Sequence, residues 1–87
     1  MIRIWSYTTV ESKITKSYIY ESIDNFSEEK FRFHIEKICH KLDIPTPVIL
    51  KTHIENFENF NMVTFSVRDF IESVDFEKFI IENAILN

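Results

Sequence analysis

The chain of 87 residues contains no glycine, and this absence limits both its turns and the ligand sites that it can build. Average glycine usage is about 7%, so roughly six glycines would be expected. Glycine lets backbone N–H groups come close to a phosphate and lets turns take positive φ. The chain therefore lacks the P-loop, the dinucleotide-binding fingerprint, the G-x-S-x-G elbow, the EF-hand loop and the glycine motifs of RRM and KH domains. The accompanying shortage of alanine, proline and arginine is typical of an AT-rich genome, so the missing glycine excludes functions without indicating one.

Length and composition predict one domain spanning residues 1–87, with a well-supplied core. Hydrophobic residues make up 45% of the chain, and nine of them are Phe. The single cysteine, Cys39, cannot form an internal disulfide, which suits a reducing cytosol. The first ten residues lack the pattern of a signal peptide, and no apolar run is long enough to span a membrane. We therefore expect a cytoplasmic protein that does not bind membranes.

Charge is spread unevenly along the chain, whose formal net charge is −4. Residues 1–20 carry three basic residues and one acidic residue, whereas residues 21–87 carry seven basic and thirteen acidic residues. Phosphate contacts dominate nucleic-acid affinity, so the overall acidity disfavours nucleic acid as a partner. A small basic face near the N-terminus remains compatible with it.

Two segments rich in β-forming residues, 2–10 and 14–23, flank the short polar stretch 11–13 and predict a β-hairpin. With a loop of two or four residues, Trp5 would lie opposite Tyr18, Arg3 opposite Tyr20 and Tyr7 beside Lys16. A loop of three residues would shift the pairing by one and mix the two faces. The turn lacks Asn-Gly and Asp-Gly, so the sequence leaves the register open.

Helical spacing is clearest over residues 27–42. Ser27 is a suitable N-cap, and the apolar stripe consists of Phe31, Ile35, Ile38 and Leu42. Pro45 ends this helix. A second helix is expected to begin at once, with Thr46 as its cap and Pro47 in its first turn, and to end near Asn59–Asn61.

The remaining segments complete the predicted fold. Residues 63–65 should be extended, residues 66–69 resemble a capping box that opens a helical turn through Glu72, and residues 76–86 predict a last strand. That strand is apolar on both faces, which favours a central position. The prediction is an α+β fold of ββααβ type, in which two main helices pack on one face of an antiparallel sheet of three or four strands.

Short sequence motifs in residues 37–82 resemble those of a family of small uncharacterised proteins, about 85 residues long, from low-GC Gram-positive bacteria. They lie in the runs ICHKLDIPTPVILKTH and TFSVRDFIESVDFEKFIIE and include K-L-D-x-P-x-P, DFIE and VDFEKF. The resemblance covers over half of the chain and implies a similar N-terminal hairpin. Relatives commonly carry Trp at the position of Ile49. The family brings no known activity, so the resemblance implies no catalytic residue.

Two sets of residues are candidate binding surfaces. The first is an aromatic and basic face of the hairpin, which would suit a protein interface or stack single-stranded nucleic acid: Arg3, Trp5, Tyr7, Lys16, Tyr18 and Tyr20. It could equally pack beneath the helices as a cross-strand ladder. The second set lies opposite the core stripe of the first helix and consists of Phe33, Lys37 and His40.

Histidine, cysteine and the carboxylates give no strong indication of catalysis. Cys39 should lie near the core stripe and His40 on the opposite side, so a metal site with His34 and His53 is not expected. We expect no cofactor and three partly exposed histidines. The paired carboxylates, Asp69 with Glu72 and Asp75 with Glu77, are best interpreted as a solvated rim.

The favoured hypothesis is a small cytoplasmic protein-interaction module without catalytic activity, with a protein partner or a second copy of itself. A variant of this hypothesis is an inhibitor encoded by a mobile element, because an acidic protein can block a basic nucleic-acid-binding cleft. The alternatives are a single-stranded nucleic-acid binder that uses the hairpin face and an enzyme with a groove near its histidines. With Asn and Asp in place of glycine at turns, recognition through side chains is expected.

Overall fold

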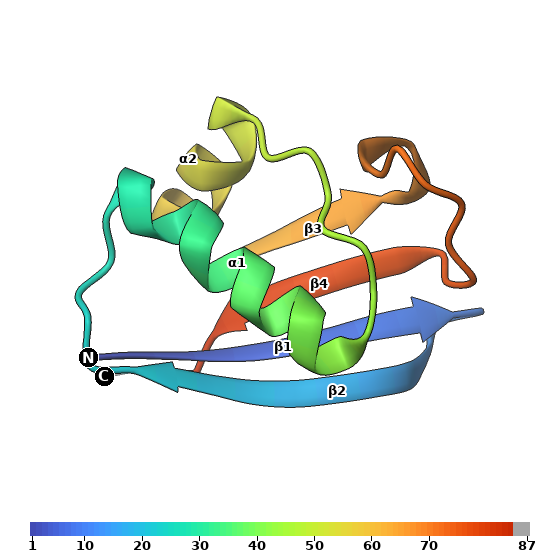
Figure 1. Ribbon diagram of the computed structural model, residues 1–87, viewed down its shortest axis with the longest axis horizontal. Helices are drawn as coiled ribbons and strands as arrows, with labels where there is room; N and C mark the ends of the chain where they lie inside the picture. The colour runs from blue at the N-terminus through green and yellow to red at the C-terminus, as the bar shows by residue number, and fades with distance from the viewer. Residues whose placement is uncertain (85–87) are drawn as a thin grey trace.

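The computed structural model describes residues 1–84, which form a four-stranded antiparallel sheet and two helices (Figure 1). The strands are β1 (Ile2–Val10), β2 (Lys13–Ser22), β3 (Met62–Ser66) and β4 (Lys78–Asn83). The helices are α1 (Glu28–Leu42) and α2 (Lys51–Phe60), and a short 3-10 turn, η1 (Val67–Asp69), follows β3. The strand order is β2-β1-β4-β3, so β1 and β4 are central. The predicted α+β class with an antiparallel sheet is confirmed.

The β1–β2 turn takes positive φ without glycine, at two residues that carry side chains. Its two loop residues, Glu11 and Ser12, have φ values of 52° and 65°. Positive φ at both central positions is the geometry of a type I′ turn, whose twist matches that of the flanking strands. The predicted hairpin is confirmed, and its loop has two residues, the shortest of the three lengths considered.

A bulge in β2 displaces the hairpin register from the one expected for a loop of two residues. Val10 pairs with Lys13 and Thr9 with Ile14, but Thr8 pairs with Lys16, so Thr15 is an extra residue on β2. From there on the pairing is displaced by one position, and Trp5 lies opposite Ile19 instead of Tyr18. A shift of one residue exchanges the two faces of a strand, so the pairings of Trp5, Arg3 and Tyr7 that were expected for a loop of two or four residues do not form. The pairing shifted by one, which the sequence left open, forms instead, although the loop has two residues.

Helix α1 follows its sequence signals closely. The side chain of Ser27 accepts a hydrogen bond from the N–H of Lys30 at 3.2 Å, as an N-cap should. At the other end Asp43 has a φ of 57° and takes the left-handed position that glycine usually fills. The predicted apolar stripe is buried, and it faces the sheet: Phe31, Ile35, Ile38 and Leu42.

Helix α2 begins later than predicted. Residues 44–50 are not helical, and Leu50, not Thr46, is the N-cap residue. The N–H of Val48 donates to the carbonyl of Asp69 at 2.8 Å, which holds this segment against η1 in an extended course. The ring of His53 then accepts the N–H of Leu50 at 2.9 Å and replaces the missing side-chain cap. Asn61 ends the helix with a φ of 59°, as predicted.

The last third of the chain agrees with the prediction in order but not in extent. The capping box of Ser66 and Asp69 is present, yet the turn ends at Asp69 and not at Glu72. Strand β4 runs over Lys78–Asn83 and lies between β1 and β3, so its predicted central position is confirmed. The predicted strand extended to residue 86, and its residues 85–86 lie outside the described part.

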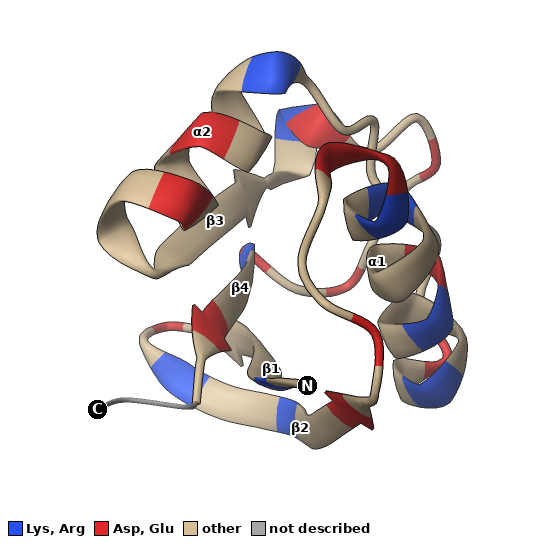
Figure 2. Ribbon diagram, turned by 90° about the vertical axis from the view of Figure 1, so that its left-hand side faces the viewer, with Lys and Arg blue, Asp and Glu red and all other residues tan. Residues whose placement is uncertain are grey.

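Both helices lie over the same face of a curved sheet, as the end-on view of Figure 2 shows. The core between them is built from side chains of all the main elements, including Ile4, Phe31, Ile38, Phe65, Phe79 and Ile81. Over residues 1–84, neither helix combines the length and the apolar composition that crossing a bilayer requires.

Candidate functional site

The face of the sheet that points away from the helices carries a continuous set of apolar side chains. Side chains alternate along each strand, so the partners of the core residues lie on this outer face. We call it the open face, and its centre consists of Trp5, Tyr7, Ile19, Ile80 and Met62. Ile19 and Met62 are exposed, and the other three are half-buried by their neighbours. A sheet face with an apolar centre is a candidate interface.

Trp5 and Tyr7 form the middle of the open face. Their ring centroids are 4.3 Å apart, and the hydroxyl of Tyr7 donates to the Glu82 carboxylate at 2.5 Å. Burial raises the pKa of Tyr7 to about 12, and the hydrogen bond and negative charge of Glu82 add to the shift. Tyr7 thus stays protonated at neutral pH and keeps Glu82 oriented.

The predicted aromatic and basic face does not exist as one surface, because the bulge at Thr15 divides it. Arg3, Trp5 and Tyr7 lie on the open face, where Arg3 pairs with Glu21 at 2.9 Å. The other three residues, Lys16, Tyr18 and Tyr20, lie on the helix side. Lys16 donates to the carbonyl of Leu42 at 3.0 Å, at the C-terminal end of α1. The six residues of the predicted face are therefore divided between the two sides of the sheet, with one cation and two aromatic rings on each.

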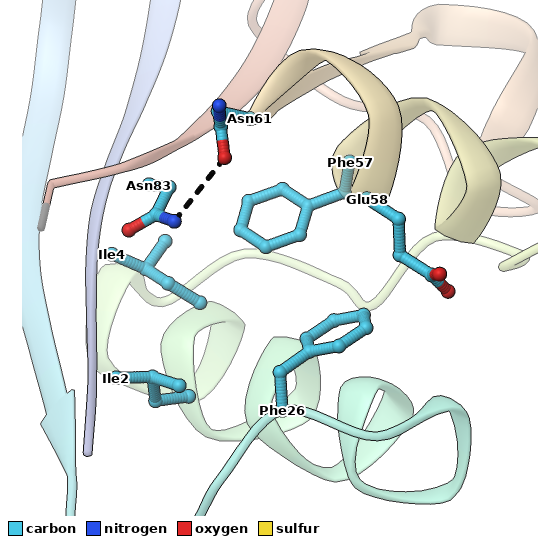
Figure 3. A pocket seen from close by; sticks show the side chains of 7 residues that line it. All are labelled: Ile2, Ile4, Phe26, Phe57, Glu58, Asn61 and Asn83. Atoms are coloured by element: carbon cyan, nitrogen blue, oxygen red, sulfur yellow. Dashed lines mark hydrogen bonds between the residues drawn. The ribbon is translucent and has the colours of Figure 1, made fainter. Parts of the chain in front are cut away.

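A cavity opens at one end of the molecule between β1, α2 and the segment that leads into α1 (Figure 3). Its volume is about 330 Å³, which lies in the lower part of the range of small-molecule sites. The apolar wall consists of Ile2, Ile4, Phe26 and Phe57. The rings of Phe26 and Phe57 have centroids 5.6 Å apart, and Phe31 packs against both.

Three polar side chains complete the cavity: Glu58, Asn61 and Asn83. Figure 3 shows the two amides close together, and Asn83 Nδ2 donates to Asn61 Oδ1 at 3.3 Å. The backbones of the same two residues are joined by a hydrogen bond of 2.7 Å, which ties the end of α2 to β4. The cavity thus has an apolar body and a polar rim that carries one negative charge.

Sequence reasoning missed this cavity because its walls come from segments far apart in the chain. One signal is present in the sequence, since Phe26 directly precedes the N-cap Ser27 and Phe31 lies four residues after that cap, which is the spacing of a hydrophobic staple. This contact forms, with ring centroids 5.7 Å apart. What the sequence could not supply is the position of Phe57 against the same ring.

The predicted second surface, on the outer side of α1, does bring its residues together. Phe33, Lys37 and His40 line a shallow hollow with Glu36. The ring of Phe33 is 45% exposed, and the ammonium groups of Lys30 and Lys37 lie 5.8 and 5.3 Å from its centroid. The lysines of the helix itself thus cover part of this ring, which reduces the apolar area offered to a partner.

Two of the three histidines are buried, which corrects the expectation of partial exposure. His34 is 0% exposed, and its Nδ1 is 2.8 Å from the Tyr20 hydroxyl. His53 packs on the ring of Phe65, and its Nε2 lies 3.6 Å from the Asp69 carboxylate. Since its other ring nitrogen accepts the Leu50 N–H, His53 connects α2 to η1.

No group of three or more His, Cys, Asp or Glu side chains within residues 1–84 is arranged to hold a metal ion. Asp69 accepts hydrogen bonds from the N–H and hydroxyl of Ser66 at 2.8 and 3.3 Å, so this carboxylate caps η1. Cys39 is buried in the core, and burial raises the pKa of its thiol to about 12.

No protein-family model, curated protein or solved structure matches this chain.

Proposed function

We propose that the protein is a non-catalytic interaction module that pairs with a second copy of itself through the open face of its sheet. The observation that carries the proposal is an apolar centre, Trp5 and Tyr7 with Ile19 and Ile80, on a face that neither helix covers. Trp and Tyr are the residues that most often anchor protein interfaces. Two such sheets can pack face to face with their side chains interdigitated.

The charges of the open face favour a second copy as the occupant. Its strand residues include two bases, Arg3 and Lys78, and two acids, Glu21 and Glu82, so they carry no net charge. Arg3 is already paired with Glu21, and Glu82 accepts the hydroxyl of Tyr7. Lys78 forms no ion pair within residues 1–84, and Glu11 and Glu77 line a hollow beside Tyr7 and Ile80, so this end of the face carries charges of both signs. A second copy, which has the same charges of both signs, is therefore the occupant that the proposal names.

The same charge balance speaks against nucleic acid as the partner. A strand-binding groove combines several cations with stacked rings, and affinity grows with each phosphate that is neutralised. On the open face Arg3 is neutralised by Glu21, and Lys16 lies on the other side of the sheet. The single-stranded nucleic-acid hypothesis thus loses the surface on which it depended.

The test is the molar mass in solution over a wide range of concentration, measured by light scattering after size exclusion. The wild type is expected to be a dimer at high concentration, with Trp5 emission shifting to shorter wavelength as dimers form. Ile19→Lys should raise the dimer dissociation constant at least tenfold, because it places a charge in the apolar centre.

Ile71→Lys is the matched control, since Ile71 is 90% exposed in the connection before β4 and the substitution is identical. It should leave dimerisation unchanged. A wild type that stays monomeric at every concentration, or a dimer that Ile19→Lys does not weaken, would overturn the proposal.

A further inference from the structure

The cavity between β1 and α2 is separate from the open face and has its own chemistry. Ile2 and Ile4 alternate with Arg3 and Trp5 along β1, so their side chains point to the helix side of the sheet. A molecule seated there would contact α2 and the start of α1, not the surface proposed for self-association.

The volume and walls of the cavity fit a small apolar body. A water molecule occupies about 30 Å³ of liquid, so 330 Å³ holds a molecule of roughly ten non-hydrogen atoms. One wall is made by the two adjacent rings of Phe26 and Phe57, and the other by two isoleucines of β1. A single aromatic ring with a short chain has the right size and the right surface.

The charge around the cavity indicates which polar group such a molecule would carry. Glu58 is the one charged residue that lines it, and within residues 1–84 its carboxylate makes no hydrogen bond or ion pair. Figure 2 looks onto this end of the molecule and shows the acidic positions of α2, which are Glu55 and Glu58. The ammonium group of Met1 is nearby in sequence, but it donates to the side chain of Asn25 at 3.2 Å. The rings of Phe26 and Phe57 also attract a cation to their faces.

We propose that this cavity binds a small amphiphile with an aromatic or aliphatic body and an ammonium head. The body fills the space between the phenylalanines and the isoleucines, and the ammonium group pairs with Glu58 at the rim. This goes beyond the proposed self-association and does not depend on it.

The test compares three probes of similar size in an NMR titration: 2-phenylethylammonium, 3-phenylpropionate and 2-phenylethanol. The amine is expected to shift the methyl signals of Ile2 and Ile4 and the side-chain amide signals of Asn61. The carboxylate should bind at least tenfold more weakly than the amine, with the alcohol in between. Trp5 lies on the opposite face, so its indole signal should not move.

Two variants on α2 separate the role of Glu58 from a general effect of acidic charge. Glu58→Gln should reduce the affinity for the amine to that for the alcohol and leave the alcohol unchanged. Glu55→Gln makes the same change one helical turn earlier, outside the cavity lining, and should bind the amine like the wild type. Ile2→Phe should fill the cavity and abolish binding of all three probes, with a thermal melt to verify that the variant is folded.

The proposal is overturned if the amine causes no shifts at millimolar concentration, if the carboxylate binds as well as the amine, or if Glu55→Gln acts like Glu58→Gln. Binding that disappears in Ile19→Lys would place the probe on the open face and would also overturn it. A monomeric wild type that still binds the amine would refute self-association alone.

Discussion

At the scale of single residues, the most unusual group is the buried imidazole of His34. Its Nδ1 is hydrogen-bonded to the Tyr20 hydroxyl, whereas its Nε2 is buried and, among the described residues, has no hydrogen-bond partner. Burial lowers the pKa of His34 below its ordinary value of 6.5, Lys30 lowers it further, and Asp24 opposes both. The helix therefore carries a histidine that the folded protein keeps neutral.

This burial predicts a loss of stability in mild acid. His34 binds a proton near pH 6.5 in the unfolded chain and only at lower pH in the folded chain. The contribution of neutral His34 to the free energy of unfolding is therefore complete above pH 6.5 and is lost as the pH falls below it. The urea concentration at the midpoint of unfolding should decrease when the pH is lowered from 7.5 to 5.5. A direct NMR titration of the imidazole should give a pKa below 6.5.

His40→Gln is the control for this prediction, because His40 lies on the exposed side of the same helix. It should keep the pH dependence of the wild type, whereas His34→Gln should flatten it. An imidazole pKa at or above 6.5 for His34 would contradict the prediction.

A second prediction concerns Cys39, whose thiol pKa is raised to about 12 by burial. At pH 8 only about one thiol in ten thousand is then ionised, since each pH unit below the pKa lowers the ratio of thiolate to thiol tenfold. A disulfide reagent at pH 8 should not label the native protein within minutes but should label it at once in concentrated urea. Rapid labelling of the native protein would show that Cys39 is accessible.

At the scale of elements, the β1–β2 hairpin stores avoidable strain in its turn. A residue with a side chain in the left-handed region costs roughly 1–2 kcal/mol, and Ser12 has a φ of 65°. Ser12→Gly should therefore stabilise the protein by about 0.5–1 kcal/mol after the greater freedom of the unfolded glycine chain is subtracted. Urea unfolding at a constant m-value measures the gain.

Ser17→Gly provides the comparison, because Ser17 lies within β2 and needs no positive φ. It should destabilise the protein by roughly 0.5–1 kcal/mol. If both glycines destabilise equally, the turn does not hold the strain described.

The elements also show what the sequence can and cannot reveal. Helix α1 could be predicted because its cap, its apolar stripe and the proline that ends it all lie within the nineteen residues from Ser27 to Pro45. The late start of α2 could not, because it depends on the bond from Val48 to Asp69, some twenty residues away. The bulge at Thr15 left no mark in the alternation of side chains, and it alone moved Tyr18 and Tyr20 to the helix side. Only half of the predicted face therefore lies on one side of the sheet, and the cavity, built from distant segments, was not foreseen.

At the scale of the whole molecule, the strand order makes the fold depend on β4. This strand pairs with β1 on one side and with β3 on the other, and it supplies the fully buried Phe79 and Ile81. A fragment of residues 1–76 should lack a cooperative thermal transition and a near-UV circular dichroism signal. Adding a peptide of residues 77–87 should restore both, whereas a fragment that melts cooperatively by itself would contradict this dependence.

The central place of β4 also has a consequence for how the protein is made. Every other described element leaves the ribosome before the strand that joins them, and at about 5–20 residues per second the first 76 residues take roughly 4–15 s to synthesise. Phe31, which is made in the first half of the chain, therefore has no complete sheet to pack against until β4 has been made. A nascent chain that still lacks β4 thus leaves aromatic side chains of the future core without their packing partners.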